Sequence, residues 1–503
     1  MVNPCDSQLI KTISYTTIGG IMFGQFIIGG FVVDRIGRKL GSIFTATMMT
    51  LFGFLIACSY GTTLNNQFTM FTTLQFFFGV GVGGEYPTAS TSANERAENT
   101  RTLKSRRGET VVSVFSMQGW GNFINTLVIC LLVALTAQTG KGYPAQQLNV
   151  DILAIIWRTS YLIGVIPALF MLFWRIFVLK ESAVWIGKRR ALKDLGPVDN
   201  AMLFRKYQLY LYHYWHRIFA CAMAWFVWDF AFYGNKLFQG TFIGIINPGA
   251  GPSTVLWWTL LNSGVSLIGY YFAAFTVDRR WMGRRIMQSM GFTWMFILFG
   301  ASAIWYNQLK TSQNIHAFQF LYYFSSFWGQ FGPNATTWLL PAELAPTEYR
   351  SFSHGVAAAV GKAGALTSGV VFGLVSNVDK FIISAVCGLA GAILTILMIG
   401  DLTGLDLKEG DKRWLAYLDG KTYHGEAVNP KHLSLFERLI GYGRLYDPAA
   451  AASEGKFHTE VAQVGGLVVG TKTEAGPGED KVVEPRGTAG KDVSFEAKNL
   501  QYM

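Results

Sequence analysis

Three ionisable residues lie inside long apolar stretches of this 503-residue chain, where a charge is costly. Glu85 follows a glycine-rich stretch, Asp229 lies well inside its run, and Lys362 belongs to the small-residue stretch 355–364. An acid that must bind and release a proton needs a partly desolvated site, which Glu85 and Asp229 both have. These residue types predict a proton-linked path for an anion whose charge Lys362 offsets. The alternative for each residue is a structural charge pair or a charge at a helix end.

These three residues are positioned by the apolar runs in which they lie. A helix needs about 20 mostly apolar residues to cross a bilayer. The chain is 51% hydrophobic and only 15% charged, whereas soluble domains carry about 25% charged residues. Eleven runs are present, over residues 12–33, 41–60, 67–92, 109–136, 153–179, 217–245, 253–277, 286–305, 315–340, 354–376 and 380–400. We therefore predict an all-α polytopic membrane protein with 11 spans. Five cysteines without paired spacing predict buried, inert thiols rather than a metal site.

Lysine and arginine gather in alternate loops, which are 34–40, 93–108, 180–216 and 278–285. Basic loops mark the cytoplasmic side of a membrane protein. The net charge of +11 therefore reflects orientation in a lipid bilayer and excludes a nucleic-acid partner.

The loop lengths and this orientation predict four segments. They are an N-terminal transmembrane bundle of five helices (1–179), a cytoplasmic central loop (180–216), a C-terminal transmembrane bundle of six helices (217–400) and a cytoplasmic tail (401–503) that is disordered from about 450. The odd number of spans places Met1 outside, so we expect the reading frame to extend upstream by one further apolar run.

A short motif occurs twice, each time in a tight basic turn between two apolar runs. Its pattern is G-x-x-x-D-R-x-G-R-R/K. The second copy begins with alanine and has three residues, instead of one, between its first arginine and its glycine. The glycine lets helices approach closely, and the aspartate can cap the facing helix or pair with an arginine of the turn. We expect a structural gating role for eight residues, which are Asp34, Arg35, Gly37 and Arg38 in the first copy and Asp278, Arg279, Gly283 and Arg284 in the second.

The paired motif resembles the major facilitator superfamily, whose two six-helix halves each carry this turn. The likeness spans residues 10–410 and implies a fold of twelve helices, of which this chain begins at the second. Within the superfamily, Gly83-Gly84-Glu85-Tyr86-Pro87 and Phe331-Gly332-Pro333-Asn334 are similar to the fungal phosphate:proton symporter family. The sequence Glu85-Tyr86-Pro87-Thr88 also looks like the glycerophosphodiester permeases of that family, which carry glycerophosphoinositol or glycerophosphocholine. Tyr233 and Asn334 look more like the inorganic phosphate carriers.

The resemblance implies a symporter that moves protons together with phosphate or a glycerophosphodiester across the plasma membrane. By this resemblance the substrate-binding residues are Tyr86, Gln118, Trp225, Asp229, Tyr233, Asn334 and Lys362, and the proton-coupling residues are Glu85 and Asp229. The expected partners are the small anionic substrate, protons and the lipid bilayer. We expect no cofactor, no metal and a monomer.

Two other functional classes stay open. One is a non-transporting nutrient receptor or regulatory relative with a long cytoplasmic tail. The other is a facilitator for a sugar or polyol, which Asp229 and Lys362 disfavour because an uncharged substrate needs no charges at membrane depth. Enzymes are not expected, because the sequence has no Walker A loop, no G-x-S-x-G and no H-E-x-x-H.

Overall fold

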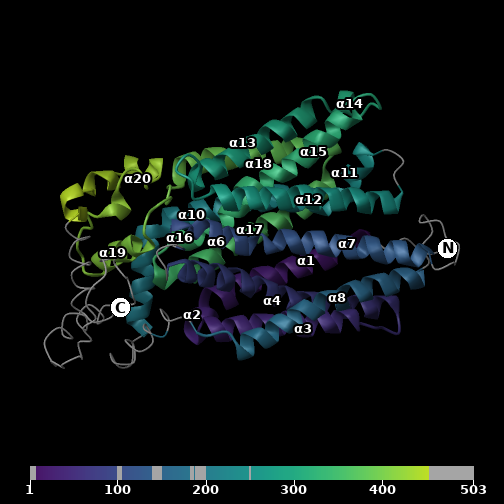
Figure 1. Ribbon diagram of the computed structural model, residues 1–503, viewed down its shortest axis with the longest axis horizontal. Helices are drawn as coiled ribbons and strands as arrows, with labels where there is room; N and C mark the ends of the chain where they lie inside the picture. Colours follow the sequence, from purple (N-terminus) through teal and green to yellow (C-terminus); the bar gives the residue numbers. More distant parts are fainter. Residues whose placement is uncertain are drawn as a thin grey trace, which may run out of the picture.

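The computed structural model of the protein describes residues 7–98, 103, 105–138, 150–181, 186, 200–247 and 251–452. These residues form helices, and none of them lies in a strand. The long helices run side by side along one axis, with most of the first half of the chain below the second half in Figure 1. The prediction of an all-α fold is thereby confirmed.

The first half of the chain packs around one long helix, α4. Its elements are α1 (Ser7–Phe23), η1 (Gly24–Val32), α2 (Val33–Ile36), α3 (Arg38–Ala57), α4 (Leu64–Glu98), α6 (Arg107–Phe115), α7 (Met117–Gln138) and α8 (Val150–Phe177). Helix α4 contacts α1 and α3, and α3 contacts α8. The α1 contact needs glycine, because a Cβ on Gly83 would come within 2.1 Å of the carbonyl oxygen of Ile21.

The second half is built around the pairs α10–α17 and α13–α18. Its elements are α10 (Asn200–Leu237), α11 (Gln239–Ile246), α12 (Pro252–Thr276), α13 (Gly283–Ile304), α14 (Tyr306–Leu309), α15 (Ile315–Gly329), η2 (Gln330–Asn334), α16 (Ala335–Glu343), η3 (Thr347–Tyr349), α17 (Arg350–Leu374) and α18 (Asn377–Met398). The two halves meet along two seams. Helix α12 packs against α6 and α7, and α17 packs against α1 and η1.

Each of the eleven apolar runs is helical over most of its length. Among the described residues, seven helical stretches are long and apolar enough to cross a membrane by length and composition. The other four runs fall in α4, α10, α12 and α15 with its continuation, which carry polar residues and glycines. The number of 11 spans therefore stays a prediction. Large apolar side chains on the outside of the bundle, such as Phe170 at 64% and Phe177 at 77% exposure on α8, provide a surface for lipid.

The predicted central loop differs from the structure, because α10 begins at Asn200 and residues 200–216 are helical. The reason is a stripe of tyrosines on this part of α10 that meets the tail. Tyr210 and Tyr214 are buried against Trp414 of α19 (Leu407–Leu418), and Tyr210 stacks on Tyr349 with ring centroids 4.1 Å apart. Burial of this aromatic face stabilises a helix that local sequence alone does not specify. The boundaries of the two bundles at 179 and 217 stay predictions.

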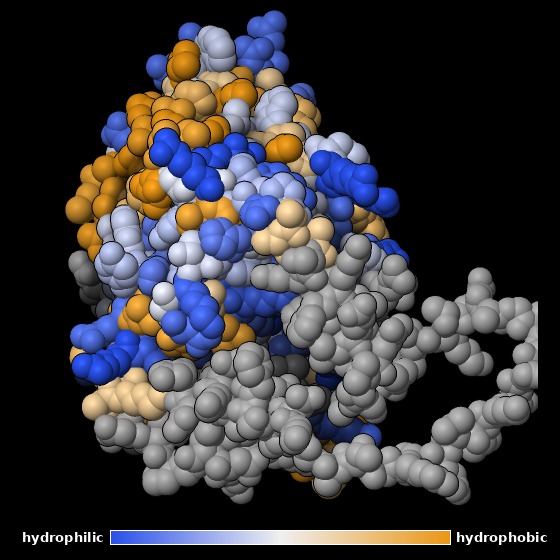
Figure 2. All heavy atoms as spheres, turned by 90° about the vertical axis from the view of Figure 1, so that its left-hand side faces the viewer, coloured by the Kyte–Doolittle hydropathy of each residue, from blue (hydrophilic) through white to orange (hydrophobic). Residues whose placement is uncertain are grey.

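The tail continues as η4 (Glu426–Val428), α20 (Leu435–Leu439) and η5 (Tyr442–Leu445) at the left-hand end of Figure 1. We call this end, which carries the tail helices and the turns of the repeated motif, the basic face. Figure 2 looks onto it and shows hydrophilic residues across the end and hydrophobic residues along the flank. The expectation of disorder from about residue 450 falls almost wholly on residues outside the described ones.

A buried carboxylate fastens the tail to α10. Glu437 accepts a 2.8 Å hydrogen bond from Nε of Arg217 and lies 3.1 Å from Nε2 of His216, while Arg413 of α19 lies within 3.7 Å. Burial by itself raises the pKa of Glu437, but Arg217, the hydrogen bond from His216 and Arg413 outweigh it and hold the pKa well below its usual range. Because the pKa is lowered by folding, this contact stabilises the fold at neutral pH and is lost only when the pH falls below the ordinary carboxyl range.

Replacing this carboxylate should therefore release the tail helices. In Glu437→Gln the shape is kept, but Arg217 and Arg413 stay buried without a counter-charge, which costs about 3 kcal/mol or more. We expect amide hydrogen exchange over residues 407–418 to become roughly 100-fold faster. Asp419→Asn, at the exposed ion pair with Lys421, is the control and should leave exchange unchanged. Loss of protection in the unaltered protein between pH 7 and pH 5, after correction for intrinsic rates, would contradict this account.

Candidate functional site

The centre of the site is a buried ion pair between α10 and α17. Nζ of Lys362 donates a 2.7 Å hydrogen bond to Oδ2 of Asp229, and the two side chains are only 3% and 2% exposed. The small-residue stretch of α17 makes this contact possible. A Cβ on Gly361 would lie 2.6 Å from the Trp225 ring, and a Cβ on Gly364 would lie 2.4 Å from the carbonyl oxygen of Phe226. The two helices therefore approach closely enough for the lysine to reach the aspartate.

Aromatic rings from both halves surround the ammonium group. Nζ of Lys362 lies 4.5 Å from the ring centroid of Tyr233 and 5.6 Å from that of Tyr86. The rings of Tyr86 and Trp225 are 6.5 Å apart. A ring face attracts a cation, and this attraction is stronger where water is excluded. The site thus holds its positive charge with one carboxylate and two ring faces.

A network of uncharged hydrogen-bonding groups continues from these rings across the interface between the halves. Gln118 of α7 donates to the Tyr86 hydroxyl over 2.6 Å and accepts from the Tyr270 hydroxyl of α12 over 2.6 Å. Nδ2 of Asn334 donates to Oε1 of Gln118 over 3.1 Å and to the Tyr270 hydroxyl over 2.6 Å. The network therefore joins the first and second halves of the chain at one point.

Residues of the second half orient Asn334 within this network. The Trp228 indole donates to Oδ1 of Asn334 over 2.9 Å, and Gln330 accepts from Nδ2 of Asn334. Both Gln330 and Asn334 belong to the π-helical turn η2, which contains Pro333. This turn brings two amide side chains to the same face next to the ion pair. An anion that enters the network meets indole, hydroxyl and amide donors that can turn toward it.

The structure places Glu85 away from this cluster. Its carboxylate accepts hydrogen bonds from Nη1 of Arg175 over 2.9 Å and from the Thr45 hydroxyl over 2.6 Å, and Arg175 approaches with its second nitrogen as well. Glu85 and Tyr86 are successive residues of a helix and so point in different directions, one toward α3 and α8 and the other toward the interface. This geometry is that of the structural charge pair, and a proton-coupling role for Glu85 stays a prediction.

The second copy of the motif forms an ion-pair network that ties the halves together at the basic face. Oε1 of Glu343 accepts from Nε of Arg107 over 2.8 Å, and Arg284 donates to both oxygens of Glu343 over 2.9 Å. The side chains of Arg107, Arg284 and Glu343 are at most 3% exposed. Arg107 belongs to the first half and the other two to the second. We call these three residues the lock.

Asp278 extends the lock as the motif predicts, because it both caps a facing helix and pairs with an arginine. Its carboxylate accepts from the backbone N–H groups of Gly108 and Glu109 at the start of α6, over 3.2 and 2.8 Å. It also accepts from Nη1 of Arg284 over 2.7 Å. Gly283 has a positive φ of 67°, which a glycine adopts without strain.

The first copy stays within the first half. Arg38 donates to Oε1 of Glu95 over 3.3 Å, and Gly37 has a positive φ of 106°. Glu181 accepts from the backbone N–H groups of Arg38 and Lys39 at the start of α3, over 2.9 and 3.1 Å. Arg35 and Arg279, one in each copy, are exposed. The side chain of Asp34 lies outside the described residues.

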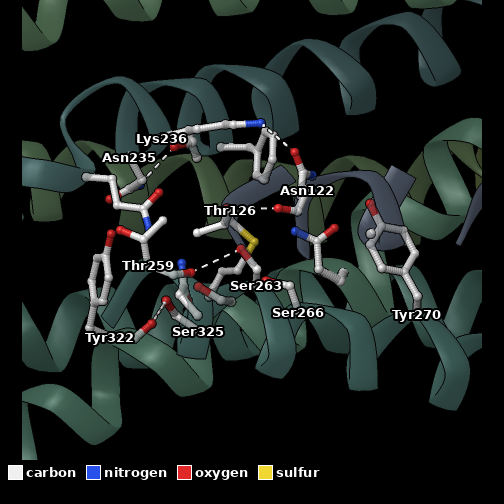
Figure 3. Close-up of a pocket in the computed structure, with 18 of the residues that line it drawn as sticks. Asn122, Thr126, Asn235, Lys236, Thr259, Ser263, Ser266, Tyr270, Tyr322 and Ser325 are labelled. Carbon is white, nitrogen blue, oxygen red and sulfur yellow. Dashed lines mark hydrogen bonds between the residues drawn. The ribbon is translucent and has the colours of Figure 1, made fainter. Parts of the chain in front are cut away.

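A cavity of about 260 Å³ adjoins the cluster, and its lining residues on α7 and α10 follow Gln118 and Trp225 along helices that lead away from the basic face in Figure 1. Tyr270, Trp228 and Gln330 belong to its lining as well as to the hydrogen-bond network. Figure 3 shows its other walls, with Asn122 and Thr126 from α7, Asn235 and Lys236 from α10, and Thr259, Ser263 and Ser266 from α12. Among the described residues, none group in a way that holds a metal ion.

Sequence reasoning missed part of this arrangement. Tyr270, Trp228 and Gln330 were not predicted as site residues. Gln330 precedes Asn334 by one helical turn, and this spacing of two amides in an apolar run is a signal for a shared polar face. The sequence contains a clearer signal for the cavity. A polar stripe at helical spacing interrupts an otherwise apolar run, and it consists of Thr259, Asn262, Ser263 and Ser266.

The fold and the site are those of a membrane carrier with a buried polar site between two helical halves. Residues 3–194 and 212–414 match the family model described as "Sugar (and other) transporter". The chain therefore belongs to this family, which is a branch of the major facilitator superfamily.

Similar proteins and structures agree with this placement. Glycerophosphoinositol permease 1 of Candida albicans is 30% identical over 429 residues, which are 84% of this chain and 76% of that protein. Low affinity inorganic phosphate transporter 3 of Petunia hybrida is 30% identical over 396 residues, covering 70% and 71%. The proton:xylose symporter XylE, solved with 6-bromo-6-deoxy-D-glucose, superposes with a TM-score of 0.62 at 18% identity, covering 82% of this chain and 91% of that one.

Proposed function

We propose that this protein is a symporter that carries phosphate or a glycerophosphodiester together with protons across the plasma membrane, with its basic face and tail on the cytoplasmic side. The relatives named above support the substrate class, and the basic loops support the orientation. The observation that carries the proposal is the Asp229–Lys362 pair, buried at 2.7 Å among hydrogen-bond donors from both halves. Because one chain supplies both halves of the site, a monomer suffices.

The ion pair couples the proton to the anion by competition for Lys362. While Asp229 is ionised, it neutralises the lysine, and a buried anion would find no free counter-charge. When Asp229 takes up a proton, the ammonium group is left with two ring faces and becomes the partner of the anion. The amide and hydroxyl groups of Gln118, Tyr86 and Asn334 then donate further hydrogen bonds to the anion.

Alternating access follows from the placement of the lock. In this structure the lock holds the halves together at the basic face, while the cavity extends from the site toward the opposite end. Rocking of the halves about the site would break the lock and close the cavity. The bound anion would then be accessible from the cytoplasm. Loss of the proton from Asp229 then restores the ion pair and displaces the anion.

Uptake by vesicles that contain the purified full chain tests this proposal. We expect uptake of radiolabelled orthophosphate or glycerophosphoinositol to rise several-fold when the external pH falls from 7.5 to 5.5, because Asp229 must be protonated before the anion binds. A protonophore should abolish accumulation above the external concentration. Uptake that responds neither to pH nor to the protonophore would exclude proton coupling. Binding without any uptake would instead favour the nutrient receptor.

A further inference from the structure

The cavity beside the ion pair has a lining of unusual chemistry. Its polar residues are asparagines, glutamines, serines, threonines and tyrosines, and Lys236 is the charged residue among the described ones that line it. Nζ of Lys236 already donates to Oδ1 of Asn122 over 3.3 Å. Apart from this ammonium group, the polar groups of the lining are uncharged, so the cavity suits a ligand part that is rich in hydrogen-bonding groups and carries no positive charge.

The hydroxyl groups of this lining act mainly as acceptors. Each of four hydroxyls donates its hydrogen to a backbone carbonyl of its own helix, over 2.6 to 3.0 Å, and these belong to Thr126, Thr259, Ser263 and Ser325. Three of these bonds are drawn in Figure 3. A hydroxyl that has used its hydrogen offers lone pairs to its other neighbours. Lone pairs repel the oxygens of a phosphate but accept hydrogen bonds from the O–H groups of a polyol.

The volume of the cavity and the apolar parts of its wall also favour a polyol over orthophosphate. A cavity of about 150 Å³ admits a benzene ring, and this one of about 260 Å³ has room for a six-carbon ring with its substituents. Phe232, Phe299 and Trp228 provide apolar wall between the polar groups. A cyclic polyol presents C–H faces to such walls and hydroxyls at its edge, whereas orthophosphate has no apolar face.

The cavity also adjoins the site of the ion pair, because residues of its lining belong to the hydrogen-bond network. The Tyr270 hydroxyl donates to Gln118, and Gln330 accepts from Asn334, while both Tyr270 and Gln330 line the cavity. A molecule with its phosphate beside Lys362 would thus place a group attached to that phosphate in the cavity. Resting on the proposed function, we infer that the cavity is a subsite for the polyol head of a phosphodiester, so that the preferred substrate is a glycerophosphodiester of a cyclic polyol rather than orthophosphate or a choline ester.

The inference is tested by competition for binding to the purified full chain. Labelled glycerophosphoinositol is displaced by unlabelled glycerophosphoinositol, glycerophosphocholine, orthophosphate or free inositol. We expect glycerophosphoinositol to compete at least tenfold better than the other three. The choline head of glycerophosphocholine has no O–H donor, because its hydroxyl is esterified to the phosphate, and it brings a second cation to Lys236. Orthophosphate leaves the cavity empty, and inositol lacks the charged group. Equal competition by glycerophosphocholine, or by orthophosphate, would overturn the inference.

A triple variant locates the subsite. Thr126→Val, Thr259→Val and Ser263→Ala together remove three acceptors while nearly keeping their shapes. We expect the preference for glycerophosphoinositol over orthophosphate to fall about tenfold, since each neutral hydrogen bond contributes modestly. Thr276→Val is the matched control, because this threonine donates to Phe272 on the same helix α12 but does not line the cavity. An unchanged preference in the triple variant would overturn the subsite.

The outcomes separate this inference from the proposed function. Proton-driven uptake of orthophosphate without a preference for glycerophosphoinositol would leave the function standing and refute the subsite. Selective binding of glycerophosphoinositol that depends on the three hydroxyls, in a protein whose uptake ignores a proton gradient, would refute proton coupling and leave the subsite standing.

Discussion

Asp229→Asn should abolish accumulation of the substrate against a gradient and also reduce the amount of protein in the membrane. Asparagine keeps the shape of aspartate but neither binds a proton nor carries a charge. Lys362 is then buried without a counter-ion, and removing one partner of a buried ion pair costs about 3–5 kcal/mol. A marginally stable protein loses abundance at such a cost.

The double variant separates the two effects. Adding Lys362→Gln to Asp229→Asn removes the stranded cation, so we expect abundance to recover while accumulation stays absent. Uptake and surface abundance are measured in the same vesicles. Asp151→Asn serves as the control, because this aspartate is exposed in the first turn of α8. Normal accumulation at normal abundance in Asp229→Asn would remove Asp229 from the mechanism.

The second large effect is expected at the lock. In Glu343→Gln the carboxylate that Arg107 and Arg284 share becomes neutral, and the buried contact between the halves loses about 3–5 kcal/mol. Moving a two-state equilibrium from 99:1 to 1:99 takes about 5.5 kcal/mol. We therefore expect the basic face to open in most molecules that hold no substrate.

Distances between spin labels measure this opening. Labels on R106C and R280C, in a chain whose native cysteines are replaced by alanine, report on the separation of α6 from the turn before α13. Glu95→Gln is the matched control, because Glu95 pairs with Arg38 inside the first half. That change should leave the distance between the halves as it was. An unchanged distance in Glu343→Gln would show that the lock does not hold the basic face closed.

The sequence predicted the helical architecture well because long apolar runs have few alternatives to helix in a bilayer. The helix over residues 200–216, within the predicted central loop, was not expected for a physical reason. Tyr210 and Tyr214 are buried against Tyr349 and Trp414, and partners more than a hundred residues away leave no local signal. Helix propensity within a segment says little when the stabilising contact comes from outside it.

The candidate site was predictable in its residues but only partly in its geometry. Asp229, Lys362, Tyr86 and Tyr233 do lie together, because ionisable groups in apolar helices must find partners. The side of helix α4 from which the Glu85 side chain projects was not predictable. A shift of one position turns a side chain by about 100° around a helix, and its neighbours on other helices decide which face is buried.

The sharing of Glu343 by two arginines has a consequence for the release of the substrate. Arg284 holds this carboxylate with two hydrogen bonds and lies in the same half, whereas Arg107 holds it with one from the other half. When the halves part, the carboxylate leaves with Arg284. Arg107 then loses this partner and keeps the attraction of Glu98 in its own half. Under the proposed function, the arginine that helps to close the basic face would then attract the departing anion, and a stronger attraction would slow the release of that anion.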